Sequence, residues 1–382
     1  MKRKALFQIF IFASMIGSSQ SMAPKNPERD PYLQVIYHSG VYWSRTEYLA
    51  DAFDDGFKAL EARLGFQSTG KETWQHIHFF PKYGFGLHYA DLIADRGDTA
   101  LGNPFSAFAF YSAPWARFGR FTLSTDLALG LSYTSVIHDP VLNPFNDVIA
   151  SHLNLYFDFD VNLFVALTKR LDLSGGYGLT HYSNGRIHQP QKGVNNWGWN
   201  LGLSYHFSGQ RPVLERKSAP GFVSKDQLQI MYGAGTVEHQ RLGDPEGVRY
   251  FTSSFTVDYV VSFNHRMALA FGTDFLYDGS VARAIKGLPE EEVTPFQRTY
   301  LGSHLGYHYL IDRFTVLVNL GTYFWQHTRD RGMWFIRAGG RIQLTDHLFT
   351  QICIKTKNGV RADWIEWGMA YSFEIGRGDP GE

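Results

Sequence analysis

The chain has 382 residues with 36 basic and 36 acidic side chains, and its formal net charge of zero gives no reason to expect nucleic acid as a partner. Aromatic residues make up 16% of the chain, which favours strands over helices. The single cysteine, Cys353, excludes an intramolecular disulfide and a CxxC metal site, and no HExxH, P-loop or GxGxxG pattern occurs. We therefore expect neither a metal nor an organic cofactor.

The N-terminal segment has the pattern of a secretory signal peptide. Three basic residues at 2–4 precede an apolar stretch from about Ala5 to Gly17 and a small polar run that ends at Ser21. We predict that residues 1–21 are the signal peptide and that the mature protein is exported. Beyond this segment, no apolar run approaches the roughly 18 residues that a membrane-spanning helix needs.

From Tyr32 to Glu374 the sequence alternates with a period of two in about sixteen segments of roughly 10 to 15 residues. Between Phe121 and Tyr133 one face is large and apolar, and the other is small and polar. Strands this long, behind an export signal, predict an all-β, antiparallel transmembrane β-barrel that shows its apolar face to lipid, in preference to a secreted β-sandwich or lectin-like protein. Aromatic residues near segment ends fit the girdles of such barrels or simply favour strands; they are Tyr42, Trp43, Trp197, Trp199, Tyr323 and Trp325.

Three short matches recur in the same order along the chain. Residues 33–37 resemble 228–232, residues 120–123 resemble 313–316, and the aromatic ending 203–207 resembles 369–373. The repeat predicts two related halves of about eight strands each, at 31–207 and 226–374, joined by a linker at 208–225. The halves form either tandem eight-stranded barrels or one barrel of about sixteen strands.

A histidine and a serine stand at the end of the strand predicted at 171–183. By strand alternation His181 and Ser183 share the face of the leucines, which points to lipid. A polar side chain on that face costs free energy unless it has a partner or sits at the membrane interface. The pair is either two wetted residues at a strand end, or a serine nucleophile activated by a histidine.

The run His181-x-Ser183-Asn184, ahead of a final strand that ends in an aromatic residue, resembles the PagL-type lipid A 3-O-deacylases and the related acyloxyacyl hydrolases. The resemblance covers about Tyr32 to Phe207. It implies an eight-stranded outer-membrane barrel that cleaves an ester-linked acyl chain from lipopolysaccharide. It also implies that Ser183 is the nucleophile, His181 the base and Asn184 a contributor to the oxyanion hole.

The sequence departs from the family pattern at the third catalytic position. The family has a glutamate on the next strand that orients the histidine, whereas this chain has Asn195 there and no acidic residue between His181 and Phe207. We therefore expect either a slower hydrolase or a triad completed by Asn195 or Asn196. His188 in the loop between the two strands is a rival base or a headgroup contact.

The second half has Lys355 and Lys357 where the first has His181 and Ser183, so we expect that copy to be chemically inert, with its lysines snorkelling to the membrane interface. The resemblance implies lipid A in the outer leaflet as the partner and the outer membrane of a Gram-negative bacterium as the location. Arg186 and Lys192 are candidates for contacting its phosphates. The competing functions are a catalytically inactive barrel, structural or adhesive, and a small-solute pore, which would need one sixteen-stranded barrel.

Overall fold

The computed structural model describes residues 29–43, 56–92, 95–96, 99–214, 217–224, 226–239, 247–285, 289–328, 332–359 and 361–375. The predicted signal peptide, residues 1–21, lies outside the described residues. Helices in these ranges are short: α2 spans Thr73–Ile77, and three 3₁₀ turns span Gly279–Ala284, Glu290–Glu292 and Phe296–Arg298. None of the described helices is long and apolar enough to cross a membrane.

The first half closes into a barrel of eight antiparallel strands, in the order β1-β2-β3-β6-β7-β8-β9-β10. Closure comes from β10 pairing back onto β1, with Val35 opposite Leu203. The strands are β1 (Arg29–Tyr42), β2 (Phe57–Ser68), β3 (Lys82–Asp91), β6 (Phe105–Phe118), β7 (Phe121–Tyr133), β8 (Leu153–Ala166), β9 (Leu171–Ser183) and β10 (Val194–His206). Two short strands, β4 (Asp95–Arg96) and β5 (Thr99–Ala100), pair only with each other.

The second half forms a separate closed barrel, in which β18 pairs back onto β11. Its strands are β11 (Asp226–His239), β12 (Val248–Asn264), β13 (Met267–Asp278), β14 (Thr299–Ile311), β15 (Phe314–Gln326), β16 (Trp334–Gln343), β17 (Leu348–Lys357) and β18 (Arg361–Ile375). The prediction of two related halves of eight strands is confirmed, and the alternative of one barrel of about sixteen strands is wrong. A pore that needs the wide barrel is excluded with it.

The two faces of each strand differ as the alternation predicts. In β7, Leu129 and Leu131 are exposed on the outer face, whereas Asp126, Ala128 and Ser132 are buried in the interior. Small barrels of eight strands have interiors that side chains fill, and here those side chains are largely polar.

One of the aromatic residues considered for a girdle, and one lysine expected at the membrane interface, point into the second barrel. In β15, Tyr323 has the same parity as Asn319 and is buried inside the second barrel, so its assignment to a girdle is wrong. Lys355 does not snorkel: it is buried in the same interior, where Nζ lies 2.6 Å from Asp363 Oδ2 and 4.0 Å from the centre of the Trp364 ring. A buried ammonium is stabilised by such a carboxylate partner.

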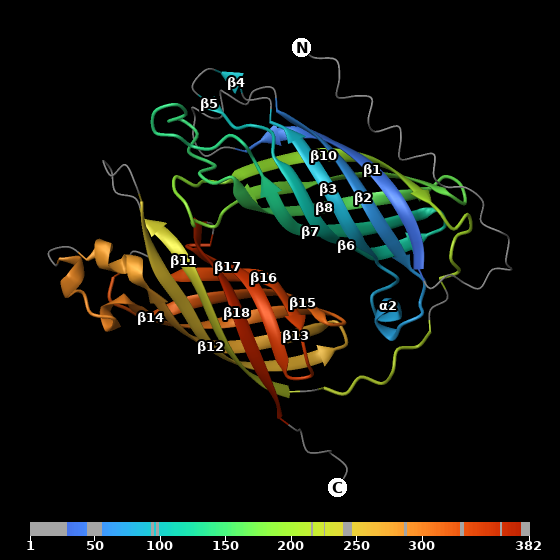
Figure 1. Cartoon of the computed structure of the whole chain (residues 1–382). Helices are drawn as coiled ribbons and strands as arrows, with labels where there is room; N and C mark the ends of the chain where they lie inside the picture. Colours follow the sequence, from blue (N-terminus) through green and yellow to red (C-terminus); the bar gives the residue numbers. More distant parts are fainter. Residues whose placement is uncertain are drawn as a thin grey trace, which may run out of the picture.

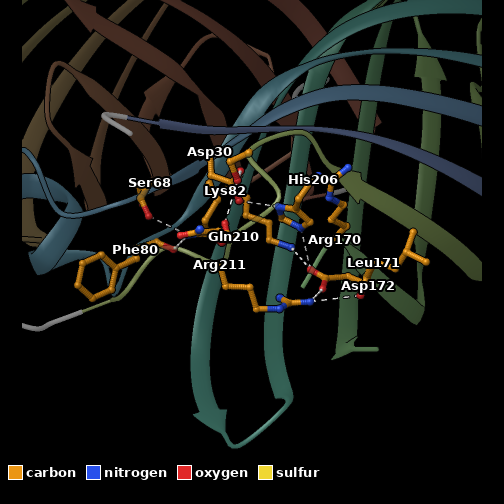
Figure 2. A network of polar contacts seen from close by, with 12 residues as sticks. Asp30, Ser68, Phe80, Lys82, Arg170, Leu171, Asp172, His206, Gln210 and Arg211 are labelled. Carbon is orange, nitrogen blue, oxygen red and sulfur yellow. Dashed lines mark hydrogen bonds and ion pairs between the residues drawn. The ribbon is translucent and has the colours of Figure 1, made fainter. Parts of the chain in front are cut away.

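The longer connections follow β1, β3, β7 and β9 at one end of the first barrel, which we call its loop end. The linker leaves the opposite end, which we call the turn end. In the second barrel, the loop end is the one where β11, β13, β15 and β17 finish. A polar network closes the turn end of the first barrel, as Figure 2 shows. His206 bridges Asp30 Oδ2 at 2.7 Å and Asp172 Oδ2 at 3.0 Å. Lys82 and the linker residue Arg211 also contact Asp172, so the linker begins anchored in the barrel mouth.

The two barrels lie side by side (Figure 1) and contact each other at both ends. At the turn end, the Nδ1 atom of His78, which follows α2, lies 3.0 Å from the Tyr309 hydroxyl. At the loop end, the backbone N–H of Glu238 donates to the carbonyl oxygen of Arg186 at 3.0 Å. Loop end therefore meets loop end, and the two barrels run in the same direction.

Candidate active site

Strand β9 carries His181 and Ser183 at positions that face outward from the first barrel, at its loop end. Inward residues of β9, such as Thr180 and Tyr182, are buried in the barrel, while Tyr177 on the parity of His181 is exposed. The register places His181 opposite Asn195 of β10, and Ser183 opposite Leu155 of β8. The site therefore lies on the outer wall of the barrel.

A direct hydrogen bond orients the histidine. His181 Nδ1 lies 2.7 Å from Asn195 Oδ1, across the β9–β10 pair. Because an amide oxygen only accepts, this contact puts the ring hydrogen on Nδ1 and leaves Nε2 free to accept a proton. Asn196, the other asparagine considered for this position, is buried on the inner face, so the alternative that it completes the triad is wrong.

Loop backbone packs over Ser183, whose exposed fraction is 5% although its strand position faces outward. A Cβ at Gly193 would lie 2.8 Å from His181 Cε1 and 3.4 Å from Ser183 Cβ, so this glycine backbone touches both side chains. The φ of Gly193 is +74°, a conformation that favours glycine. Within the described residues no hydrogen bond joins Ser183 to His181; such contacts are often long in enzymes without bound substrate.

Asn184 begins the loop beyond β9 and is bonded at both ends of its amide. Its Nδ2 donates to Ser151 Oγ at 2.8 Å, and its Oδ1 accepts the backbone N–H of Arg186 at 3.0 Å. An amide nitrogen has two hydrogens, and only one is needed for the Ser151 contact. The amide of the residue that follows Ser183 in sequence is thus fixed by two contacts, and its nitrogen has a second hydrogen.

Two family models match the chain. One, described as lipid A 3-O-deacylase (PagL), matches residues 59–204, and the other, described as acyloxyacyl hydrolase, C-terminal domain, matches residues 226–375. Together they span most of both barrels. The chain belongs to the PagL family. Family membership supports a hydrolase that deacylates lipid A and points to the Gram-negative outer membrane, where lipid A is found.

No curated protein matches the chain. Among solved structures, it is similar to the siderophore receptor PirA from Acinetobacter baumannii, with 12% identity and a TM-score of 0.23 over 88% of this chain and 44% of that one. It is also similar to the Pseudomonas putida toluene transporter TodX, with 10% identity and a TM-score of 0.18 over 92% and 90%. The chain thus spans less than half of the receptor, and TM-scores this low carry no argument about function.

The charged residues of the loop between β9 and β10 face protein partners in this PagL-family chain. Arg186 Nη1 lies 3.7 Å from Asp363 Oδ1 in the second barrel, and Lys192 pairs with Asp147 of the loop before β8. His188, considered above as a rival base, lies 3.3 Å from Glu238 and 2.6 Å from an Arg249 nitrogen. These side chains are therefore engaged in holding the loop.

The sequence does not reveal the residues that surround His181, Ser183 and Asn195. Ser151 and Gly193 lie in loops, and the contacts from Glu238, Arg249 and Asp363 come from the other barrel. Strand periodicity carries no signal for any of them. The described residues also contain one cluster with metal-ligating side chains, His38, Glu61 and His88, inside the first barrel.

Proposed function

We propose that the protein is an outer-membrane serine esterase that removes an ester-linked acyl chain from the lipid A part of lipopolysaccharide, with Ser183 as nucleophile. The observation that carries the proposal is the 2.7 Å contact between His181 Nδ1 and Asn195 Oδ1 on the strand face that Ser183 shares. A serine, a histidine and a group that orients the histidine form the arrangement of nucleophilic acyl transfer.

In the first step, Ser183 Oγ attacks the acyl carbonyl while His181 Nε2 takes the hydroxyl proton. The carbonyl oxygen becomes an oxyanion, for which the free N–H of Asn184 is the side-chain donor. Loss of one such donor typically costs about 100- to 1000-fold in rate. The intermediate then collapses: the bond between the acyl carbon and the sugar oxygen breaks, and His181 returns the proton to that oxygen. The sugar departs with a free hydroxyl, and the acyl chain stays on Ser183.

In the second step, a water molecule attacks the Ser183 ester while His181 takes a proton from it. The bond between the acyl carbon and Ser183 Oγ breaks, His181 returns the proton to Oγ, and the fatty acid is released. Asn195 keeps the imidazole in the tautomer that both steps require. As an amide, it cannot stabilise the imidazolium by charge, so we expect turnover below that of an enzyme with a carboxylate in this position.

The position of Ser183, His181 and Asn195 suits a substrate that lies in a membrane. The outer wall below it is apolar, with exposed Leu173, Tyr177 and Leu201 on β9 and β10. Acyl chains can lie along such a wall while the ester reaches the loop end, at the level of the sugar headgroup. The substrate then approaches from the outer leaflet, and the barrel interior takes no part in binding.

A serine-reactive fluorophosphonate with a long alkyl chain tests the proposal. Wild type, folded in detergent, should gain one phosphonyl adduct by intact mass at Ser183, and Ser183→Ala should gain none. His181→Ala should react at least about 100-fold more slowly, because the base is missing. Folded wild type that stays unlabelled would overturn the proposal in favour of the competing function, a catalytically inactive barrel, which the missing carboxylate favours.

A further inference from the structure

The loop between β9 and β10, residues 184–193, bridges the candidate active site and the second barrel. Its first residue, Asn184, and its last, Gly193, flank Ser183 and His181. Its middle lies against three neighbouring strands of the second barrel, β12, β11 and β18. One short loop thus joins the proposed catalytic residues to a barrel that lacks them.

Polar contacts from β11 are concentrated on Glu238. Its backbone N–H donates to the carbonyl of Arg186 at 3.0 Å, and its Oε1 accepts the backbone N–H of Gln189 at 3.2 Å. Its other carboxylate oxygen lies 3.3 Å from His188 Nδ1, and Arg249 of β12 contacts the same imidazole at 2.6 Å. A single glutamate therefore contacts three residues of the loop, Arg186, His188 and Gln189.

Strand β18 supplies an apolar and a charged contact. A Cβ at Gly185 would lie 2.3 Å from Ile365 Cδ1, so the loop backbone rests directly on this side chain. The Arg186 guanidinium faces Asp363, which is fully buried. Arg186 has a φ of +74°, a conformation that costs free energy for a residue with a Cβ and that surrounding contacts must maintain.

We propose that the second barrel positions the active-site loop: Glu238, Asp363 and Ile365 hold residues 185–189 so that Asn184 and Gly193 keep their places beside Ser183 and His181. Glu238 is a positioning residue, since it acts through the loop and does not reach the reacting atoms. This inference rests on the proposed esterase function, and it gives the inert second barrel a role in that reaction.

The test uses full-length Glu238→Ala, with Glu238→Gln as the conservative variant. Glu290→Ala is the matched control, because Glu290 is an ion-paired glutamate at the same end of the second barrel, bonded to Arg283 at 3.3 Å. Hydrogen–deuterium exchange of a peptide covering 184–193 reports docking, and fatty-acid release from lipid A reports kcat and KM. Loss of docking should lower kcat about 10- to 100-fold with little change in KM, because small misplacements of catalytic groups have such effects.

We expect Glu238→Ala to speed exchange in the loop and lower kcat, Glu238→Gln to restore both, and Glu290→Ala to change neither. Unchanged exchange in Glu238→Ala, or faster exchange with wild-type kcat, would overturn the inference. Exchange is measured without substrate, so a wild-type protein that shows no deacylation but a docked loop would contradict the esterase function and leave docking itself supported.

A second inference comes from an independent observation inside the first barrel. His38 of β1, Glu61 of β2 and His88 of β3 bring their ligand atoms within 4.8 Å of one another, and all three side chains are buried. His38 Nε2 and Glu61 Oε2 are already 3.1 Å apart, near the spacing of neighbouring ligands around zinc, about 3.3 Å for bonds of about 2.0 Å.

Three features of this cluster favour a cation. His88 Nε2 is buried and has no hydrogen-bond partner, while its Nδ1 lies 3.2 Å from the Tyr182 hydroxyl, which fixes the ring. Arg63 contacts the second oxygen of Glu61, as outer ligands of metal sites do. Arg63 also faces Asp126 and Asp158, at 2.6 and 3.8 Å, so one guanidinium is shared among three buried carboxyl groups.

We infer that His38, Glu61 and His88 form a binding site for a divalent transition metal, of which zinc best fits two imidazoles and a carboxylate. The reaction proposed above does not draw on this site, which lies inside the barrel wall. The expected role is structural: a dication ties three consecutive strands together.

Zinc binding can be measured on full-length protein that has been refolded, stripped with chelator, equilibrated with zinc and dialysed. Wild type should retain a single ion by elemental mass spectrometry, and His88→Gln none. His308→Gln is the matched control, because His308 is buried in the second barrel with a Nε2 that also has no partner. Circular dichroism checks that each variant is folded, and His38→Gln replaces His88→Gln if that variant does not fold. No zinc on folded wild type, or wild-type zinc on the folded variant, would overturn this inference.

Discussion

Asn195 accepts a hydrogen bond from His181 at 2.7 Å, but its amide carries no charge to stabilise the imidazolium that forms during each proton transfer. Replacing it with alanine removes the group that fixes the tautomer, and we expect kcat to fall about 10- to 100-fold. Asn195→Asp adds the missing charge without a change in size, and it should raise kcat above wild type. Initial rates of fatty-acid release from lipid A measure both effects. Wild-type kcat in Asn195→Ala would contradict this assignment.

Gly193 packs against the imidazole, and the chain offers a matched control for it. A methyl group at Gly193 would lie 2.8 Å from His181 Cε1, whereas one at Gly119, in the turn between β6 and β7, would meet nothing within 4 Å. Both glycines have positive φ, of +74° and +61°, so alanine carries a similar backbone cost at each. We expect Gly193→Ala to lower kcat at least about tenfold. Gly119→Ala should keep wild-type kcat, and equal losses in the two variants would indicate a purely structural effect.

For individual residues of the site, the sequence predicts which way a side chain points better than it predicts what surrounds that side chain. Strand parity assigns His181 and Ser183 to the outer face and Asn195 to the same face, because side chains alternate strictly along a strand. Strand parity does not predict that Gly193 packs against Ser183 or that Asn184 binds Ser151, since those contacts depend on loop conformation.

The segment between β2 and β3, which contains α2, links the turn ends of the two barrels. His78 lies between Tyr111 and Tyr309, and the neighbouring Phe79 ring packs under the Arg266 guanidinium. Burial, with a smaller effect from Arg266, lowers the pKa of His78 to about 4. The folded protein therefore keeps this imidazole neutral at a pH where an exposed histidine would be protonated.

We expect the contribution of His78 to stability to depend on pH between its unfolded pKa, about 6.5, and its folded pKa, about 4. In that window the unfolded chain binds a proton that the folded chain does not, so the free energy of unfolding falls as the pH falls. The loss is complete below pH 4 and reaches at most about 3 kcal/mol. Urea unfolding in detergent at several pH values, for wild type and His78→Gln, should show a smaller decline in the variant. Parallel pH profiles would contradict the burial of a neutral His78.

Periodicity predicts the strands well and their closure poorly. The outer and inner faces of β7 follow directly from alternation, and the repeat of short segments predicts two halves. Whether β10 pairs with β1 or β11 is decided by contacts between residues about 170 positions apart, such as Val35 and Leu203, which no local pattern encodes. The inward position of Lys355, by contrast, follows from alternation, because Lys355 shares the parity of the buried Gln351 and Cys353. The expectation that it snorkels placed it at the membrane interface instead.

In the molecule as a whole, two barrels of the same fold carry different side chains at their loop ends. The first carries the serine, the histidine and the asparagine on its outer wall, and the second contacts it at both the loop end and the turn end. Because both barrels run in the same direction, both apolar walls can lie in one membrane. The apolar wall of the second barrel then lies beside that of the first, and β11 and β18 contact the loop that follows β9.

We propose that this molecule deacylates lipid A through Ser183. Mass spectrometry of lipid A after incubation with folded wild type and with Ser183→Ala tests this. We predict that wild type removes a single acyl chain as a free fatty acid and that the variant, folded to the same extent, leaves lipid A intact. Unchanged lipid A in both reactions, or the same loss in both, would contradict the account.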